Sequence, residues 1–245
     1  MLPFLLMIAI IIGVILLGDA VLRPDGDGIP RAMRSYARTH GFDVSEYPES
    51  IVALYRRNPD ARQFALDYPL KHSDTLEIDL SGELGGGVPQ LYQWDERWGY
   101  RSYNQSIMGL SGCGPTCLSM VAIYLRGDAS MDPYWMAQYA EQGGYNVVGS
   151  GTAWSFMTDG ARALGIDVTE IPMDEQRIMD NLAVGNPIVC VVGPGDFTTD
   201  GHFIVLVGAE NGKIRVNDPN SMTNSGKLWT FDRLLGQVQA LWVMR

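Results

Sequence analysis

The stretch "LSGCGPTCLSMVAIYL", residues 110–125, determines how the rest of the chain is interpreted. It contains two of the three cysteines, Cys113 and Cys117, one helical turn apart. Pro115 is typical of the first turn of a helix, where its missing N–H is not needed, so we predict a helix over 114–126. Cys113 would then stand at the helix entrance, where free N–H groups and the positive end of the dipole favour the reactive thiolate. Cys113 is therefore the candidate nucleophile.

The other two cysteines are predicted to be packing residues. The apolar neighbours of Cys117 cover more than one helix face, which indicates a helix buried nearly all round. Cys190 lies in the apolar run "NPIVCVVG", which is typical of a buried strand. Gly112 and Gly114 flank the candidate nucleophile, and we expect them to allow a tight backbone path and to leave room for a substrate chain.

A reactive cysteine needs a base, and His202 is the candidate. It opens "GHFIVLVGAE", and a short turn joins this apolar run to "KIRVNDPN", a pattern that predicts a hairpin. The hairpin would return Asn217 and Asp218 to the start of the first strand, where one of them can orient the imidazole. An isolated histidine is also commonly structural, and Asp218–Pro219 also suits a turn that merely ends a strand.

A thiolate nucleophile also needs hydrogen-bond donors for the oxyanion that forms on the substrate. The backbone N–H of Cys113 is one candidate. The second would be a side-chain amide upstream, and two glutamines qualify. Gln105 is closer to the cysteine in sequence, and Gln93 lies further back in "LYQWDERWGY".

The first eighteen residues carry no charged side chain and would span roughly 27 Å as a helix, close to the thickness of a bilayer's hydrocarbon core. We expect 1–18 to be a transmembrane anchor, because the run is longer than a usual signal core and lacks a basic start. The alternative is a signal peptide cut after Ala20. Residues 19–30 read as a linker. The expected location is the cell membrane with the catalytic domain extracellular, or secretion if the segment is cleaved.

The remaining chain is predicted to consist of a helical segment followed by a domain that contains both helices and strands. Residues 31–80 are predicted to form a small helical lead-in, and the three glycines at 85–87 mark the best internal boundary. From 88 to 245 the helical patterns come mostly before the strand patterns, which indicates an α+β domain with a predominantly antiparallel sheet. The predicted helices are 114–126, 132–141, 153–164, 174–183 and 231–235, and the predicted strands are 187–193, 203–208, 213–217 and 241–244.

Composition and residue spacing argue against a nucleic-acid partner, a disulfide framework, and a metal or cofactor site. The 245 residues have a net charge of −10 and no basic run, which argues against nucleic acid. Three cysteines are too few for a disulfide framework. There is no CxxC and the histidines are isolated in sequence, so we expect neither a metal site nor a cofactor.

Three stretches together resemble the papain-like cysteine peptidases, in the branch of the bacteriocin-processing, double-glycine leader peptidases. They are "VPQLYQWDERWGYRSYNQSIMGLSGCGPTCLSMV", "GNPIVCVVGPGDFTTDGHFIVLVG" and "IRVNDPN". The resemblance covers roughly 88–245 and implies a central N-terminal helix packed on an antiparallel sheet. It implies Cys113 as nucleophile, His202 as base and Asp218 as orienting carboxylate. The family's Gln-x-Asp-x-x-Trp pattern begins at Gln93, which this resemblance makes the oxyanion donor, with Gln105 as the alternative.

The segment before 88 is similar to the lead-in of membrane-anchored bacterial members. The implied activity is hydrolysis of peptide bonds in a peptide or protein substrate, without a cofactor. Two alternatives use the same fold: a peptidoglycan amide hydrolase or transpeptidase, and a catalytically silent, membrane-tethered binding module. Trp154 and Phe197 lie in glycine-rich stretches and are candidate substrate contacts at the rim of the cleft, with ordinary packing within these loops as the alternative for both.

Overall fold

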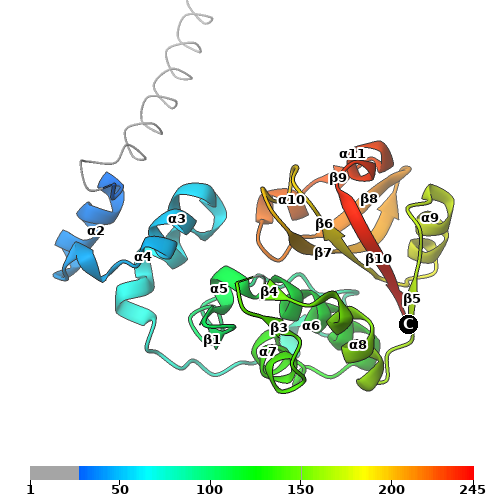
Figure 1. Cartoon of the computed structure of the whole chain (residues 1–245), viewed down its shortest axis with the longest axis horizontal. Helices are drawn as coiled ribbons and strands as arrows, with labels where there is room; N and C mark the ends of the chain where they lie inside the picture. The colour runs from blue at the N-terminus through cyan, green and yellow to red at the C-terminus, as the bar shows by residue number, and fades with distance from the viewer. Residues whose placement is uncertain (1–27, 150) are drawn as a thin grey trace, which may run out of the picture. The chain divides into compact units, whose positions relative to one another are not determined.

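The computed structural model describes residues 28–149 and 151–245, which divide into two compact units between His72 and Ser73 (Figure 1). The expected membrane anchor, 1–18, lies outside the described residues, as does most of the expected linker, 19–30. Within the described ranges, no helix combines the length and the apolar character needed to cross a bilayer.

The first unit is helical, as its sequence predicts. Pro48 is the residue before α3, and Pro59 opens the short 3-10 turn that leads into α4, so both prolines mark helix starts. Buried Asp67 joins two helices of the unit by accepting a hydrogen bond from Tyr36, and it accepts another from Lys71 within its own helix. The elements are α2 (Arg31–His40), η1 (Val44–Glu46), α3 (Glu49–Arg57), η2 (Pro59–Ala61) and α4 (Arg62–Lys71).

The second unit begins earlier than the glycine run suggests. Leu80 is buried in its core, and Arg97 donates a hydrogen bond of 2.9 Å to the carbonyl of Asp79. The three glycines at 85–87 form an exposed turn inside this unit. A glycine run therefore marks a loop here, whereas the apolar side chains on both sides of it decide which unit the segment joins.

The described residues of the second unit contain a six-stranded sheet in the order β5-β10-β6-β7-β8-β9, and every neighbouring pair is antiparallel. The predicted α+β class and antiparallel sheet are confirmed. The strands of this sheet are β5 (Val168–Glu170), β6 (Ile188–Val192), β7 (His202–Glu210), β8 (Lys213–Asn217), β9 (Leu228–Trp229) and β10 (Val238–Met244).

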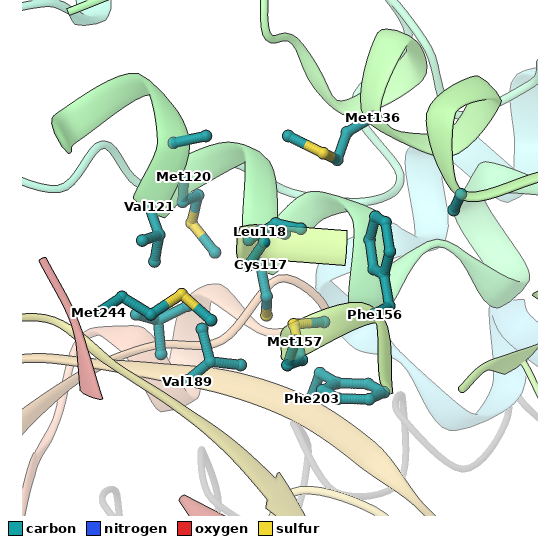
Figure 2. Packing of buried hydrophobic residues seen from close by; sticks show 14 of the residues in the cluster. Cys117, Leu118, Met120, Val121, Met136, Phe156, Met157, Val189, Phe203 and Met244 are labelled. Carbon is teal, nitrogen blue, oxygen red and sulfur yellow. The ribbon is translucent and has the colours of Figure 1, made fainter. Parts of the chain in front are cut away.

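Helices cover both faces of this sheet. Val189 and Val191 belong to the core cluster shared with α6 (Cys113–Arg126), whereas Ile188 and Cys190 belong to the cluster shared with α9 (Glu175–Ala183). Figure 2 shows Cys117 and Val121 of α6 directed at Val189, Phe203 and Met244 of the sheet. Burial on both faces explains why the strands read as continuous apolar runs rather than alternating ones.

The shorter elements depart most from the sequence pattern. The predicted helix 153–164 is divided into η4 (Trp154–Met157) and α8 (Asp159–Ala163). Strands β5 and β9 and two small hairpins were not predicted, because strands of two or three residues are too short to show a period. The remaining elements are η3 (Ser81–Glu83), β1 (Ser102–Tyr103), β2 (Ser106–Ile107), α5 (Met108–Ser111), α7 (Pro133–Gln142), β3 (Asn146–Val147), β4 (Gly151–Thr152), α10 (Met222–Ser225) and α11 (Phe231–Leu235).

Candidate active site

The site begins at the N-terminus of α6. Cys113 is the first residue of this helix and is partly accessible, whereas Cys117 one turn further on is fully buried. The helix runs without interruption through the core, so the position of the thiol is fixed by the packing of the whole helix. The predicted helix and the predicted place of Cys113 at its entrance are confirmed.

The two glycines beside Cys113 have a different purpose from the one expected. A Cβ atom on Gly114 would lie 2.6 Å from Oγ1 of Thr152, and one on Gly112 would lie 2.6 Å from the carbonyl oxygen of Met108. Real Cβ atoms do not approach other atoms so closely. The expectation that these glycines leave room for a substrate chain is therefore wrong: they leave room for neighbouring parts of the protein.

The β7–β8 hairpin supplies the second and third residues. His202 is the first residue of β7, Asp218 directly follows β8, and the antiparallel pairing brings the two together. Nε2 of His202 lies 2.8 Å from Oδ1 of Asp218, and the exposed fractions of the two residues are 7% and 0%. A carboxylate only accepts hydrogen bonds, so Nε2 is the donor. This leaves Nδ1 as the ring nitrogen available to Cys113.

Cys113 and His202 interact, and the two groups change each other's pKa. Burial alone would raise the pKa of Cys113, but the hydrogen bond and charge of His202, with the N–H groups of Phe203 and Gly114, outweigh it and lower the pKa. Burial would lower the pKa of His202, but the charge and hydrogen bond of Asp218 and the contact with Cys113 raise it. Both shifts favour a thiolate–imidazolium pair.

The other two cysteines lack such support. Cys117 and Cys190 are fully buried, and burial raises the pKa of both thiols. A buried thiol with a raised pKa is unreactive towards solutes in water. The prediction that both are packing residues is confirmed.

Asp218 is held by more partners than the sequence revealed. Its Oδ1 also accepts a hydrogen bond of 2.8 Å from the N–H of Asn220, and its Oδ2 accepts one of 3.0 Å from Nδ2 of Asn224. Asn217 is not the orienting residue, because its amide donates to the carbonyls of Val88 and Pro89. Asn224 was missed: the only signal near it is Ser221, which caps the one-turn helix α10, and this does not point to Asp218.

Gln93 belongs to the segment that lies along the end of β8. Its backbone N–H donates to the carbonyl of Pro219 at 2.8 Å, and its Nε2 donates to the carbonyl of Gly109 at 3.0 Å. Gly109 lies in α5, which leads directly into Cys113. Gln105, by contrast, is exposed in the turn between β1 and β2 with a φ of 60°. The structure thus brings Gln93 near the segments that carry Asp218 and Cys113, and places Gln105 at an exposed hairpin tip.

The rest of the glutamine motif shapes the loop around Gln93. Asp95 forms a salt bridge with Arg97, in which Nη2 and Oδ2 lie 2.8 Å apart. Trp98 is fully buried and its indole N–H donates to the carbonyl of Tyr92 at 2.8 Å. These contacts hold the loop that follows Gln93, so Asp95 and Trp98 of the motif have a structural role.

A known family of proteins is similar to most of the second unit. Residues 87–245 match the model of the Peptidase_C39 like family. The chain belongs to this C39-like family. It is accordingly a cysteine peptidase, a hydrolase whose substrates are peptides or proteins, and the resemblance to papain-like, bacteriocin-processing peptidases is confirmed. No curated protein matches the chain.

Solved structures show a weaker similarity. The peptidase domain of Streptococcus ComA, a bi-functional ABC transporter of a quorum-sensing pathway, is 21% identical with a TM-score of 0.41; the match covers 54% of this chain and 89% of that one. A Bacillus anthracis protein described as a C39-like peptidase is 14% identical with a TM-score of 0.39, covering 66% of this chain and 96% of that one.

Two aromatic residues of this C39-like peptidase were candidates for substrate contact. Phe197 is buried and its ring packs on Trp229 with 4.5 Å between centroids, so the structure agrees with loop packing and not with substrate contact for Phe197. Trp154 is 47% exposed and packs edge-on against Trp242, so its contact with substrate stays a prediction. In the described ranges, no three His, Cys, Asp or Glu side chains are grouped so that they could hold a metal ion.

Proposed function

We propose that this C39-like peptidase hydrolyses peptide bonds with Cys113 as nucleophile, His202 as general base and acid, and Asp218 as the residue that orients the imidazole. One observation carries the proposal: Nε2 of His202 lies 2.8 Å from the Asp218 carboxylate, and the same imidazole lowers the pKa of the Cys113 thiol. A nucleophile, a base and an orienting group linked in this order are the parts that covalent catalysis requires.

The proposed reaction has two steps. His202 accepts the thiol proton, and the thiolate attacks the carbonyl carbon of the peptide bond. The C–N bond breaks, His202 gives the proton to the leaving amine, and a thioester joins the acyl group to Cys113. Water then attacks the thioester while His202 accepts its proton, the carboxylic acid leaves, and the thiol returns. Asp218 keeps the proton on Nε2, so that Nδ1 faces the thiol throughout.

The oxyanion of each tetrahedral intermediate needs donors that already point at it. We assign this role to the backbone N–H of Cys113 and to the side-chain amide of Gln93. Nε2 of Gln93 has two hydrogens, and the bond to Gly109 occupies one of them. That bond also holds the amide at α5, at a residue four positions before Cys113.

Replacing Gln93 should separate substrate turnover from thiol reactivity. We expect Gln93→Ala to lower kcat for a cleaved peptide by about 100-fold or more, the usual cost of losing one oxyanion donor. The rate at which iodoacetamide alkylates Cys113 should stay the same, since alkylation forms no oxyanion. Gln105→Ala is the matched control and should keep full activity. A loss of activity in Gln105→Ala with none in Gln93→Ala would reverse the assignment.

The proposed activity is tested by incubating the protein with a library of unmodified peptides and identifying the products by mass spectrometry. Hydrolysis predicts fragment pairs whose summed mass exceeds that of the parent by one water. Products joined to a second peptide would indicate transfer, and release of fragments from purified peptidoglycan alone would indicate a cell-wall amide hydrolase. No product from either material, together with a Cys113 that alkylates like an ordinary thiol, would favour a silent binding module.

We extend the proposal to location: residues 1–18 anchor the protein in the cell membrane and the peptidase unit acts outside the cytoplasm. Support comes from the sequence, which is apolar and uncharged over this length. Fusion of alkaline phosphatase after Arg245 should give an active reporter, because this enzyme is active only after export. An inactive but expressed fusion would contradict the proposal. Recovery of a soluble product that begins after residue 20 would indicate secretion instead.

A further inference from the structure

Asn224 connects two parts of the site that come from different segments. It is 8% exposed and belongs to α10, the one-turn helix that follows Asp218. Its Nδ2 donates to Oδ2 of Asp218 at 3.0 Å and to the backbone carbonyl of Asp196 at 3.4 Å. No step of the proposed reaction uses this amide, although it touches the carboxylate that orients His202.

The backbone of Asn224 is held independently of its side chain. Its N–H donates to Oγ of Ser221 at 3.1 Å, and its carbonyl accepts the indole N–H of Trp229 at 3.1 Å. Trp229 in turn is buried and packs on Phe197. The amide of Asn224 is therefore presented from a fixed backbone, which makes it a rigid donor.

The carboxylate of Asp218 depends on such a donor because it is fully buried. Oδ1 is engaged by His202 and by the N–H of Asn220, whereas Asn224 is the donor that the structure gives to Oδ2. A buried carboxylate oxygen that loses its donor pays a desolvation cost, and the group reorients to recover a partner. Any such rotation moves Oδ1 away from Nε2 of His202.

The second acceptor, Asp196, lies in the loop between β6 and β7 that leads directly into His202. Its carboxylate is held by Arg233, with Nε and Nη2 each 2.6 Å from one oxygen, and by Nε2 of Gln237 at 2.7 Å. Its N–H donates to Oε1 of Gln237 at 2.6 Å. The carbonyl that Asn224 contacts is thus also fixed in place.

We propose that Asn224 is a positioning residue of the peptidase: its amide fixes the Asp218 carboxylate and ties it to the loop that carries His202. The proposal rests on the triad proposed above. Asn224 does not touch the reacting atoms, so it acts only through the geometry of the Asp218–His202 pair and, through that pair, on the ionisation of Cys113.

The test is the pH dependence of Cys113 alkylation by iodoacetamide in the full chain, followed by mass spectrometry between pH 4 and 9. In Asn224→Ala we expect the rate at pH 6 to fall about tenfold, the factor that corresponds to losing one hydrogen bond to a buried charged group. The inflection should move towards that of an ordinary thiol. Asn224→Leu, which has a similar size but neither a donor nor a charge, should behave in the same way. Asn58 is also a buried asparagine, but its side chain accepts a hydrogen bond from the N–H of Asp60 in the helical unit. Asn58→Ala should therefore have the same alkylation profile as the wild type.

The buried cysteines separate positioning from folding. Cys117 and Cys190 label only if the core opens, so they should stay protected in every variant. A wild-type pH profile for Cys113 in both Asn224 variants would overturn the proposal. So would labelling of Cys117 and Cys190 in both, because Asn224 would then be needed for folding instead. If Cys113 of the wild type itself is alkylated like an ordinary thiol, the result contradicts the proposed triad and not only the proposed role of Asn224.

Discussion

Cys113→Ala is expected to abolish peptide cleavage, with kcat reduced by about 10⁴-fold or more, as when the nucleophile of a catalytic triad is removed. The reason is chemical: without Sγ no thioester forms, and water in the site has no activated partner. The measurement is the product yield from a cleaved library peptide, followed over time at equal concentrations of wild-type and variant protein. The fold should persist, because Cys113 lies at the partly accessible start of α6.

Cys117→Ala is the matched control for this prediction. It removes a sulfur from the same helix, four residues further on, at a site that is fully buried. We expect it to lower the midpoint of chemical denaturation slightly and to leave turnover intact, since removing a small buried group affects packing and not chemistry. Full activity in Cys113→Ala, or complete loss in Cys117→Ala with the fold preserved, would show that the nucleophile has been misassigned.

The parts of the site that could be predicted depend on local signals. Pro115 sets the helix start and so places Cys113 at an entrance rich in N–H groups. The two apolar runs around the turn at 211–212 form a hairpin, and the hairpin alone brings Asp218 back to His202. In both cases the relevant residues are neighbours in sequence or are joined by one tight turn, so interactions between residues close in sequence are sufficient to predict the arrangement.

The parts that could not be predicted depend on packing between distant segments. Nothing beside Gly114 shows that Thr152 fills the space above it. Nothing near Phe197 shows that Trp229 buries its ring, and nothing near Asn224 shows that its amide also reaches the backbone carbonyl of Asp196, 28 residues earlier. Side-chain contacts of this kind follow from the assembled core, whereas composition and periodicity report only which residues tend to be inside.

The unit boundary illustrates the same limit. The three glycines at 85–87 predict an internal boundary, and locally they do form an exposed turn. Leu80, which precedes them, nevertheless packs in the core of the peptidase unit, and Arg97 reaches back to Asp79. The flexibility of a segment is a local property, but the unit it belongs to is decided by where its apolar side chains are buried.

His202→Ala is expected to have an effect nearly as large as that of removing the nucleophile, because it removes both the base and the acid of the proposed reaction. We expect a loss of about 10⁴-fold in kcat. Alkylation of Cys113 at pH 6 should slow by about a hundredfold, since the charge that lowers the pKa of its thiol is gone and the thiolate fraction falls. Replacing the exposed His72 by alanine is the matched control and should change neither rate.

The pH profile of the wild type tests the same pair without a mutation. The pKa of Cys113 is lowered, so the thiolate forms, and activity rises, at a pH below the ordinary thiol value of 9.0. The pKa of His202 is raised, so the imidazolium that protonates the leaving amine persists, and activity falls, only at a pH above the ordinary value of 6.5. Between the lowered pKa of Cys113 and the raised pKa of His202 the ion pair is the main form, which predicts a bell-shaped pH profile for kcat/KM. A profile that rises only near pH 9 and survives in His202→Ala would mean that Cys113 reacts without a base, and the proposed mechanism would have to be abandoned.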